Sequence, residues 1–181
     1  ALGLMAGMLT LPALAQKKIE YIEFDLDNGL HVIMHQDNTT PIVITSVLYH
    51  VGSKNEQPDR TGFAHFFEHL MFEGSPNLDR GEYASIIEAR GGTLNAFTSN
   101  DITYYYELLP SNELELALYL ESERMLQSKV DQTGVETQRE VVKEEYRQSY
   151  ENRPYGTLLL ETLKRSFAEH PYNWAPIGSL D

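Results

Sequence analysis

Apolar and polar residues alternate along much of the first half of the chain, a pattern typical of strands with one buried face. Two alternating segments, residues 19–26 and 30–36, flank Asp27-Asn28-Gly29, which favours a tight turn between antiparallel strands. Residues 41–51 are rich in β-branched side chains and predict a third strand. Residues 93–98 and 102–109 predict a second hairpin around Ser99-Asn100-Asp101.

The remaining segments favour helices, which we expect at residues 61–72, 80–89, 112–127, 133–150 and 155–168. A polar loop at residues 52–60 precedes the first of them, and Gly91-Gly92 ends the second. Strands and helices do not alternate strictly along the chain. We therefore expect an α+β fold, a two-layer sandwich in which helices pack on one face of a mainly antiparallel sheet.

One short segment carries a chemical signature, His65-Phe66-Phe67-Glu68-His69. At about 100° per residue, both imidazoles and the carboxylate project from the same side of the predicted helix. Neutral imidazole is a preferred zinc ligand, and a carboxylate beside the pair can accept a proton from water held by the metal. The order H-x-x-E-H is the inverzincin motif, the reverse of H-E-x-x-H.

A solvated polar helix face is the alternative interpretation of this segment. The flanking residues oppose it, because they make the helix apolar almost all round, as in a buried helix: Phe63, Ala64, Phe66, Phe67, Leu70, Met71 and Phe72. Ionising a buried glutamate without a cation nearby costs several kcal/mol, and otherwise the side chain stays protonated. We therefore expect a metal site.

A catalytic zinc takes three protein ligands and keeps one position for water, so a second segment must supply a ligand. The chain has no cysteine, which leaves histidine and acidic residues. On the helix predicted at residues 133–150, Glu145 lies beside the apolar face, whereas Glu140 and Glu144 lie on the far side. Glu145 is the expected ligand, although periodicity alone also allows an ordinary surface glutamate. Other histidines are not expected to bind metal: His31, His35, His50 and His170.

Together these residues resemble the N-terminal part of the pitrilysin/insulinase family of zinc metallopeptidases, which includes the mitochondrial processing peptidases. In that family a ligand glutamate follows H-x-x-E-H much later in the chain, and here Glu145 follows His69 by 76 residues. The family often carries another glutamate seven residues before this ligand, where the chain has Gln138, so the tuning of the site is in question. Further similar stretches are Asp27-Asn28-Gly29-Leu30, Val51-Gly52-Ser53, Gly91-Gly92-Thr93-Leu94-Asn95-Ala96, Thr103-Tyr104 and His170-Pro171-Tyr172.

The resemblance implies a zinc-dependent metalloendopeptidase that hydrolyses extended peptides or small proteins. It implies one Zn²⁺ per chain, held by His65, His69 and Glu145, with Glu68 as the general base. It also implies that Asn95 and Ala96 bind the peptide as an added strand, whereas the sequence alone favours ordinary strand or turn roles. Family members close a peptide-holding chamber with a second, similar domain or subunit. The alternative function is therefore a non-catalytic or half-active subunit that binds peptide and zinc.

Residues 1–15 carry no charge and end in Pro12-Ala13-Leu14-Ala15, which resembles the remnant of a secretory signal peptide. A buried N-terminal helix is the alternative, and the run is too short for a membrane span. We expect residues 16–181 to form the N-terminal domain of a bacterial exported peptidase, periplasmic or secreted, and to be truncated at the C-terminus. The net charge of −13 opposes nucleic-acid binding, because phosphate contacts need clustered Lys and Arg.

Overall fold

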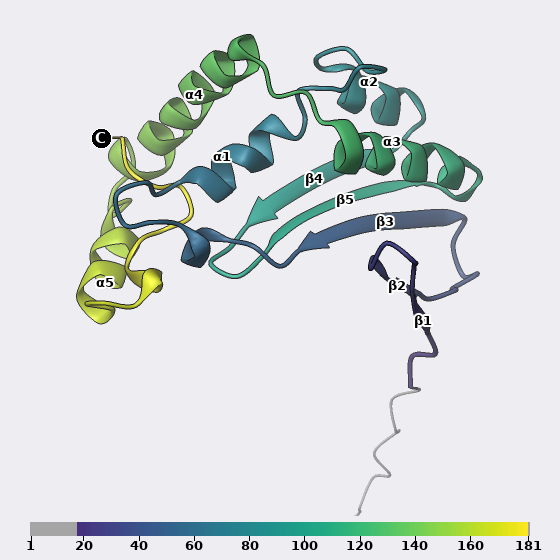
Figure 1. Ribbon diagram of the computed structural model, residues 1–181, viewed down its shortest axis with the longest axis horizontal. Helices are drawn as coiled ribbons and strands as arrows, with labels where there is room; N and C mark the ends of the chain where they lie inside the picture. The colour runs from purple at the N-terminus through teal and green to yellow at the C-terminus, as the bar shows by residue number, and fades with distance from the viewer. Residues whose placement is uncertain (1–17, 181) are drawn as a thin grey trace, which may run out of the picture. The chain divides into compact units, whose positions relative to one another are not determined.

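The computed structural model describes residues 18–180, which form two compact units divided between Thr40 and Pro41 (Figure 1). In the first unit, β1 (Ile22–Asp25) pairs antiparallel with β2 (His31–Met34). The turn between them contains Gly29 at a φ of 87°, a left-handed conformation that glycine adopts without strain. The first predicted hairpin is thereby confirmed. The expected signal-peptide remnant at residues 1–15 lies outside the described residues.

The second unit contains a three-stranded antiparallel sheet in the order β3-β5-β4. Its strands are β3 (Ile42–Tyr49), β4 (Thr93–Thr98) and β5 (Thr103–Pro110). The central strand buries every second side chain, as the alternating pattern predicts: Thr103, Tyr105, Glu107 and Leu109. Among the described residues, β4 pairs with β5 alone, so β4 is an edge strand.

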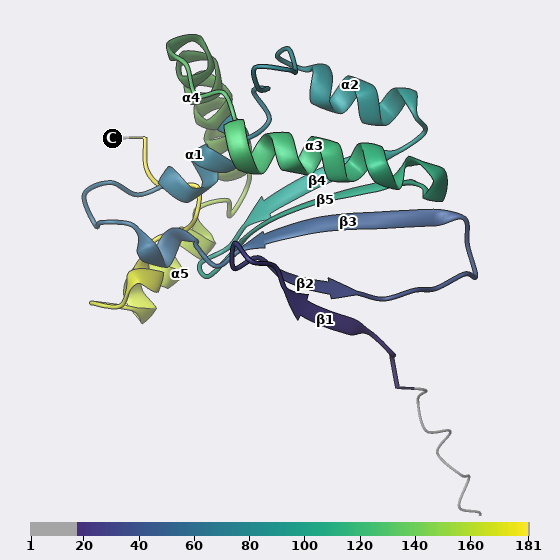
Figure 2. The same ribbon diagram turned by 45° about the vertical axis from the view of Figure 1, so that its right-hand side comes forward.

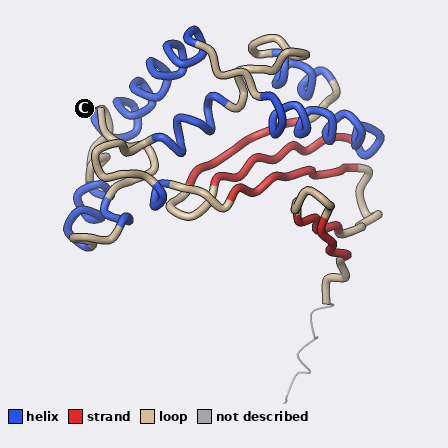
Figure 3. The backbone as a smooth tube through the Cα atoms, viewed as in Figure 1, coloured by secondary structure: helices blue, strands red, loops and turns tan. Residues whose placement is uncertain are grey.

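Three helices lie against one face of this sheet: α1 (Phe63–Leu70), α2 (Glu82–Ala89) and α3 (Leu114–Gln127) (Figure 2). A fourth helix, α4 (Gln132–Tyr146), packs against α1, and α5 (Leu158–Ser166) follows it (Figure 3). The apolar core consists of Leu78, Tyr83, Ile87, Leu109, Ala117 and Leu120. The expected α+β two-layer architecture, with helices on one face of an antiparallel sheet, is confirmed.

The helix expected at residues 61–72 is shorter in the structure, and a side chain of the preceding loop supports its beginning. Gly62 is its N-cap at a φ of 93° and offers no side chain to cap the helix. Instead, the carboxylate of Glu56 accepts hydrogen bonds from the N–H groups of Gly62 at 2.9 Å and Ala64 at 2.7 Å. Gly178 packs against this start, at a φ of 75°, and a Cβ there would lie 2.6 Å from Gly62 Cα.

The helix expected at residues 133–150 also ends earlier. The regular helix α4 stops at Tyr146, and a π-helical turn (η3, Arg147–Glu151) continues it. Such turns occur often beside functional sites, because they shift the residues that follow by one position on the helix. The helix expected at residues 155–168 is confirmed as α5 with shorter ends.

A charged cluster lies between α3 and the sheet. Glu107 on β5 is fully buried and accepts hydrogen bonds from Thr45 at 2.8 Å, Tyr83 at 2.6 Å and Arg124 at 3.1 Å. The Arg124 guanidinium lies 4.4–4.6 Å from the centres of three aromatic rings, those of Phe72, Tyr83 and Tyr105. Glu107 is therefore well supplied with hydrogen-bond donors, one of them the charged guanidinium of Arg124.

Glu121 on α3 has a different environment in the same cluster. One of its carboxyl oxygens lies 3.3 Å from Arg124, but neither oxygen accepts a hydrogen bond from any described residue. Burial, followed by the neighbouring Glu107 carboxylate, raises the pKa of Glu121 to about 9. Glu121 therefore favours its protonated form at neutral pH.

Candidate metal centre

The structure brings the two histidines of the motif and Glu145 together where α1 packs against α4. The Nε2 atoms of His65 and His69 are 3.3 Å apart. Glu145 Oε2 lies 3.7 Å from His65 Nε2 and 3.4 Å from His69 Nε2. Around a tetrahedral zinc with bonds of about 2.0–2.1 Å, ligand atoms lie roughly 3.3–3.4 Å apart. The three side chains therefore already have nearly the spacing that a shared zinc ion requires.

The local electrostatics suit a cation at this point. Burial lowers the pKa of His65, which favours the neutral imidazole that a metal ligand must present. Burial also opposes a charge on His69, but the hydrogen bond and charge of Glu145, together with Glu68, raise its pKa. The pKa of Glu145 is lowered, chiefly by its hydrogen bond with His69. Glu145 is thus a carboxylate facing two imidazoles, a donor set typical of zinc.

Glu68 lies on the same side of α1 and is almost completely buried. Its Oε2 accepts a hydrogen bond of 2.5 Å from the hydroxyl of Thr98, the last residue of β4. Burial raises the pKa of Glu68, and the Thr98 hydrogen bond opposes this rise. The contact fixes the carboxylate beside the three clustered side chains. The sequence pattern does not predict this hydrogen bond, because by its position Thr98 is an ordinary strand or turn residue.

Within residues 18–180, His65, His69 and Glu145 are the one group of three or more His, Cys, Asp or Glu side chains able to share an ion. Glu145 turns toward the motif, as its helical phase predicted. The other histidines that the structure describes lie outside this group: His31, His35, His50 and His170.

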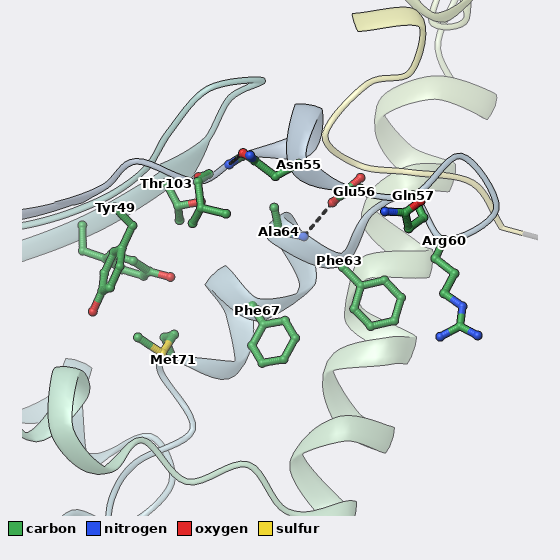
Figure 4. A pocket seen from close by; sticks show the side chains of 13 residues that line it. Tyr49, Asn55, Glu56, Gln57, Arg60, Phe63, Ala64, Phe67, Met71 and Thr103 are labelled. Carbon is green, nitrogen blue, oxygen red and sulfur yellow. Dashed lines mark hydrogen bonds between the residues drawn. The ribbon is translucent and has the colours of Figure 1, made fainter. Parts of the chain in front are cut away.

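The expectation that α1 is buried all round is wrong. Phe63 and Phe67 are 49% and 47% exposed. With Met71 they line an apolar hollow of about 530 Å³ (Figure 4), and its lining also includes Tyr49 and Tyr105. No residue of the candidate metal centre lines this hollow. Within α1 only Glu68 and Leu70 are buried, and the side that carries Phe63 and Phe67 borders the hollow.

Asn95 and Ala96 lie on the edge strand β4, which also contacts α1. The Ala96 N–H donates to Asn95 Oδ1 at 2.8 Å. Because Thr98 of the same strand reaches Glu68, β4 runs toward the candidate centre. An extended segment added to this edge would therefore also run toward Glu68.

No helix within residues 18–180 has both the length and the apolar character needed to cross a membrane.

Similarity to known proteins extends over most of the chain. A zinc protease, PqqE of Helicobacter pylori, is 38% identical over 157 residues, which cover 86% of this chain and 35% of that protein. The uncharacterized zinc protease YmxG of Bacillus subtilis is 27% identical over 156 residues, covering 86% of this chain and 38% of that protein. This chain therefore spans little more than a third of the length of these relatives.

Solved structures agree with this similarity. A protease from Helicobacter pylori matches with a TM-score of 0.87 and 36% identity, covering 90% of this chain and 39% of that one. The first half of the periplasmic protease PqqL from Escherichia coli matches with a TM-score of 0.78 and 26% identity, covering 88% of this chain and 36% of that one. Residues 31–173 also match the family model described as Insulinase (Peptidase family M16). The chain thus belongs to the insulinase family of peptidases, family M16.

Proposed function

We propose that this chain is the zinc-binding N-terminal part of a metalloendopeptidase that hydrolyses extended peptides or small proteins. The observation that carries the proposal is the triangle formed by His65 Nε2, His69 Nε2 and Glu145 Oε2, with sides of 3.3, 3.4 and 3.7 Å. Membership of a peptidase family, and relatives named zinc proteases, support the same function.

The residues of the site have separable roles in this proposal. His65, His69 and Glu145 would hold one Zn²⁺, which when bound polarises a peptide carbonyl and acidifies water. Glu68 would accept the proton of the attacking water and pass it to the leaving amine, so that the peptide C–N bond breaks as a new C–O bond forms. Thr98 holds the Glu68 carboxylate in place by its hydrogen bond of 2.5 Å.

The substrate would bind along β4. An edge strand offers unpaired main-chain groups to which an extended peptide can add as a further strand. Asn95 and Ala96 are the proposed contacts, and the small side chain of Ala96 allows a close approach. The Asn95 amide, which now accepts from the Ala96 N–H, would have to turn toward the peptide.

A second, similar domain or subunit would close the site in this proposal. The chain covers only 35–39% of PqqE, YmxG and the Helicobacter pylori protease. It covers 36% of the first half of PqqL and 19% of the whole PqqL chain. Export to the periplasm or beyond is part of the same proposal. It rests on the signal-like residues 1–15 and on the periplasmic PqqL, to which the chain is similar.

Metal analysis of the purified chain, followed by an assay on a mixed peptide library, tests the proposal. Wild type should contain about one zinc per chain. His65→Ala and Glu145→Gln should lose it, while Glu144→Gln, the neighbouring exposed glutamate, serves as the matched control and should keep it. Full zinc occupancy of Glu145→Gln would remove Glu145 from the ligand set.

Glu68→Gln should keep zinc and abolish cleavage, because glutamine cannot accept the proton. Persistent cleavage by this variant would exclude Glu68 as the base. Cleavage by wild type that a zinc chelator stops and added zinc restores supports the peptidase. Bound zinc without cleavage would instead favour a half-active subunit that awaits its second domain.

A further inference from the structure

Two of the family-like stretches that have no role in the proposed function, Val51-Gly52-Ser53 and His170-Pro171-Tyr172, lie against the same turn. This turn, Ser99-Asn100-Asp101, joins β4 to β5 and directly follows Thr98, whose hydroxyl holds Glu68. The side chains that reach the turn come from residues 47 and 71 positions away along the chain. Distant segments thus converge on the end of β4.

The loop that follows β3 packs directly on the backbone of this turn. The Ser53 N–H donates to Ser99 O at 3.1 Å, and the Lys54 N–H donates to Asn100 O at 2.9 Å. A Cβ on Gly52 would lie 2.5 Å from Ser99 O, so glycine is what allows the loop to come this close. Two carbonyl groups of the turn are thereby fixed to the loop.

The carboxylate of Asp101 joins the turn to both segments. Its Oδ1 lies 2.5 Å from Lys54 Nζ, and its Oδ2 accepts a hydrogen bond of 2.7 Å from the Tyr172 hydroxyl. His170 orients Tyr172, because its Nδ1 accepts from the Tyr172 N–H at 3.2 Å and the two rings meet edge-on with centres 4.5 Å apart. We call three of these side chains the Asp101 junction: Lys54, Asp101 and Tyr172.

The same loop also supports the start of the helix that carries Glu68. Glu56 in this loop accepts hydrogen bonds from N–H groups at the beginning of α1. Residues 52–56 therefore contact both the turn after Thr98 and the helix of Glu68. The Thr98 hydroxyl meets the Glu68 carboxylate at 2.5 Å, and a hydrogen bond weakens steeply when its partners are displaced. The position of the turn relative to the loop thus controls this hydrogen bond.

We infer that the Asp101 junction is a positioning device for the proposed general base, because it holds the turn where Thr98 reaches Glu68. The inference rests on the proposed function of Glu68. The junction shares no residue with the candidate metal centre or with the proposed peptide contacts, and it acts through Thr98. The side chains of Lys54 and Asp101 are 32% and 46% exposed, and an ion pair this exposed contributes little to stability by itself. An effect on the Thr98 contact can therefore be separated from a loss of the fold.

A double-mutant cycle on the purified full chain, stripped of metal, tests the inference. The equilibrium constant of unfolding is measured in urea for wild type, Asp101→Ala, Thr98→Val and the double variant. Substitutions at independent sites change this constant by factors that multiply to within about twofold. If the junction positions Thr98, the effect of Thr98→Val should be more than about twofold smaller in Asp101→Ala than in wild type.

Asp25→Ala is the matched control, because it also breaks an exposed ion pair, with His31. Its effect should multiply with that of Thr98→Val. If the effects of Asp101→Ala and Thr98→Val also multiply to within about twofold, the inference is overturned. If Asp101→Ala does not fold, Tyr172→Phe decides by the same cycle, since it keeps the ring and removes only the hydroxyl. Independent effects of Tyr172→Phe and Thr98→Val would then overturn the inference.

The cleavage assay gives a second, independent readout. Asp101→Ala should lower the turnover number about 3–10-fold and leave KM and the zinc content unchanged, because it displaces the support of the base and neither a ligand nor a peptide contact. In the Thr98→Val background, Asp101→Ala should lower the turnover number no further. A raised KM with an unchanged turnover number would contradict a role through Thr98.

The two proposals fail in different ways. If wild type binds no zinc and cleaves no peptide, the proposed function fails, and the urea cycle on the metal-free chain still decides whether the junction positions Thr98. If wild type binds zinc and cleaves peptides, but Asp101→Ala and Thr98→Val act independently in both assays, the proposed function stands and the inference fails.

Discussion

Glu121→Gln is expected to make the fold more resistant to alkaline pH. In the folded chain the pKa of Glu121 is raised from an ordinary value of 4.5 to about 9, firstly by burial. In the unfolded chain the same side chain is solvated and ionises near its ordinary value. A carboxyl group whose pKa is raised by folding contributes stability that is complete below the unfolded value and is lost as pH approaches the folded value. The window in question is therefore roughly pH 4.5 to 9.

The magnitude follows from proton linkage. Between the two pKa values, the folded chain binds up to one more proton at Glu121 than the unfolded chain does. The free energy of unfolding therefore falls by up to about 1.4 kcal/mol per pH unit within this window. Glutamine has the size of the protonated carboxyl and does not titrate, so this contribution disappears in the variant.

Urea unfolding followed by far-UV circular dichroism at several pH values measures the difference. The relevant quantity is the free energy of unfolding of Glu121→Gln minus that of wild type, which should rise with pH across the window. Glu115→Gln, at an exposed position of α3, should show no such trend. If wild type and Glu121→Gln lose stability in parallel as pH rises, Glu121 is not a neutral buried acid.

Three further outcomes are expected. Thr98→Val should lower the turnover number for peptide hydrolysis about 10–100-fold in steady-state kinetics, because a hydrogen bond to a carboxylate contributes about 1.5–3 kcal/mol. Thr98→Ser keeps the hydroxyl and should retain the turnover number. Equal turnover numbers in the two variants would show that the Thr98 hydrogen bond does not affect the role of Glu68. Removing zinc with a chelator should lower the melting temperature of wild type but not that of His65→Ala, because an ion that binds only the folded state stabilises it. Equal shifts of the melting temperature in both proteins would place the ion at another site. Gly178→Ala should lower the free energy of unfolding in urea by about 1–3 kcal/mol. This loss of unfolding free energy should exceed that of Gly29→Ala, because both glycines have positive φ but only a Cβ at Gly178 would meet neighbouring backbone. Similar losses in the two variants would show that the steric clash at Gly178 is not the cause.

The features that the sequence predicted well depend on local periodicity. The second hairpin, the central strand with alternate buried residues and the helical phase of Glu145 all follow from the repeat of a strand or helix. The motif residues lie on one helix, so their common direction follows from the same repeat. The fold class follows from the order of these elements.

The features that were missed depend on contacts between distant segments. Thr98, at the end of β4, donates a hydrogen bond to Glu68, which lies 30 residues earlier in the chain. The contact of Glu56 with the beginning of α1 is local, but it follows no strand or helix repeat. Gln138 appeared only as a departure from a family pattern, because its partner Glu73 lies 65 residues away. Full burial of α1 was wrongly expected, since an apolar helix can also expose one face to a hollow.

The candidate ligands also have a topological consequence. His69 and Glu145 are 76 residues apart, and the chain between them includes α2, β4, β5 and α3. An ion bound to both would act as a reversible cross-link that closes this long loop, in the way that a disulfide does but without cysteine. Detachment of α4 from α1 would then require the ion to leave one of its ligands. The rate at which amide protons of α4 exchange with solvent should therefore depend on zinc concentration, so that the metal also controls how often this helix opens.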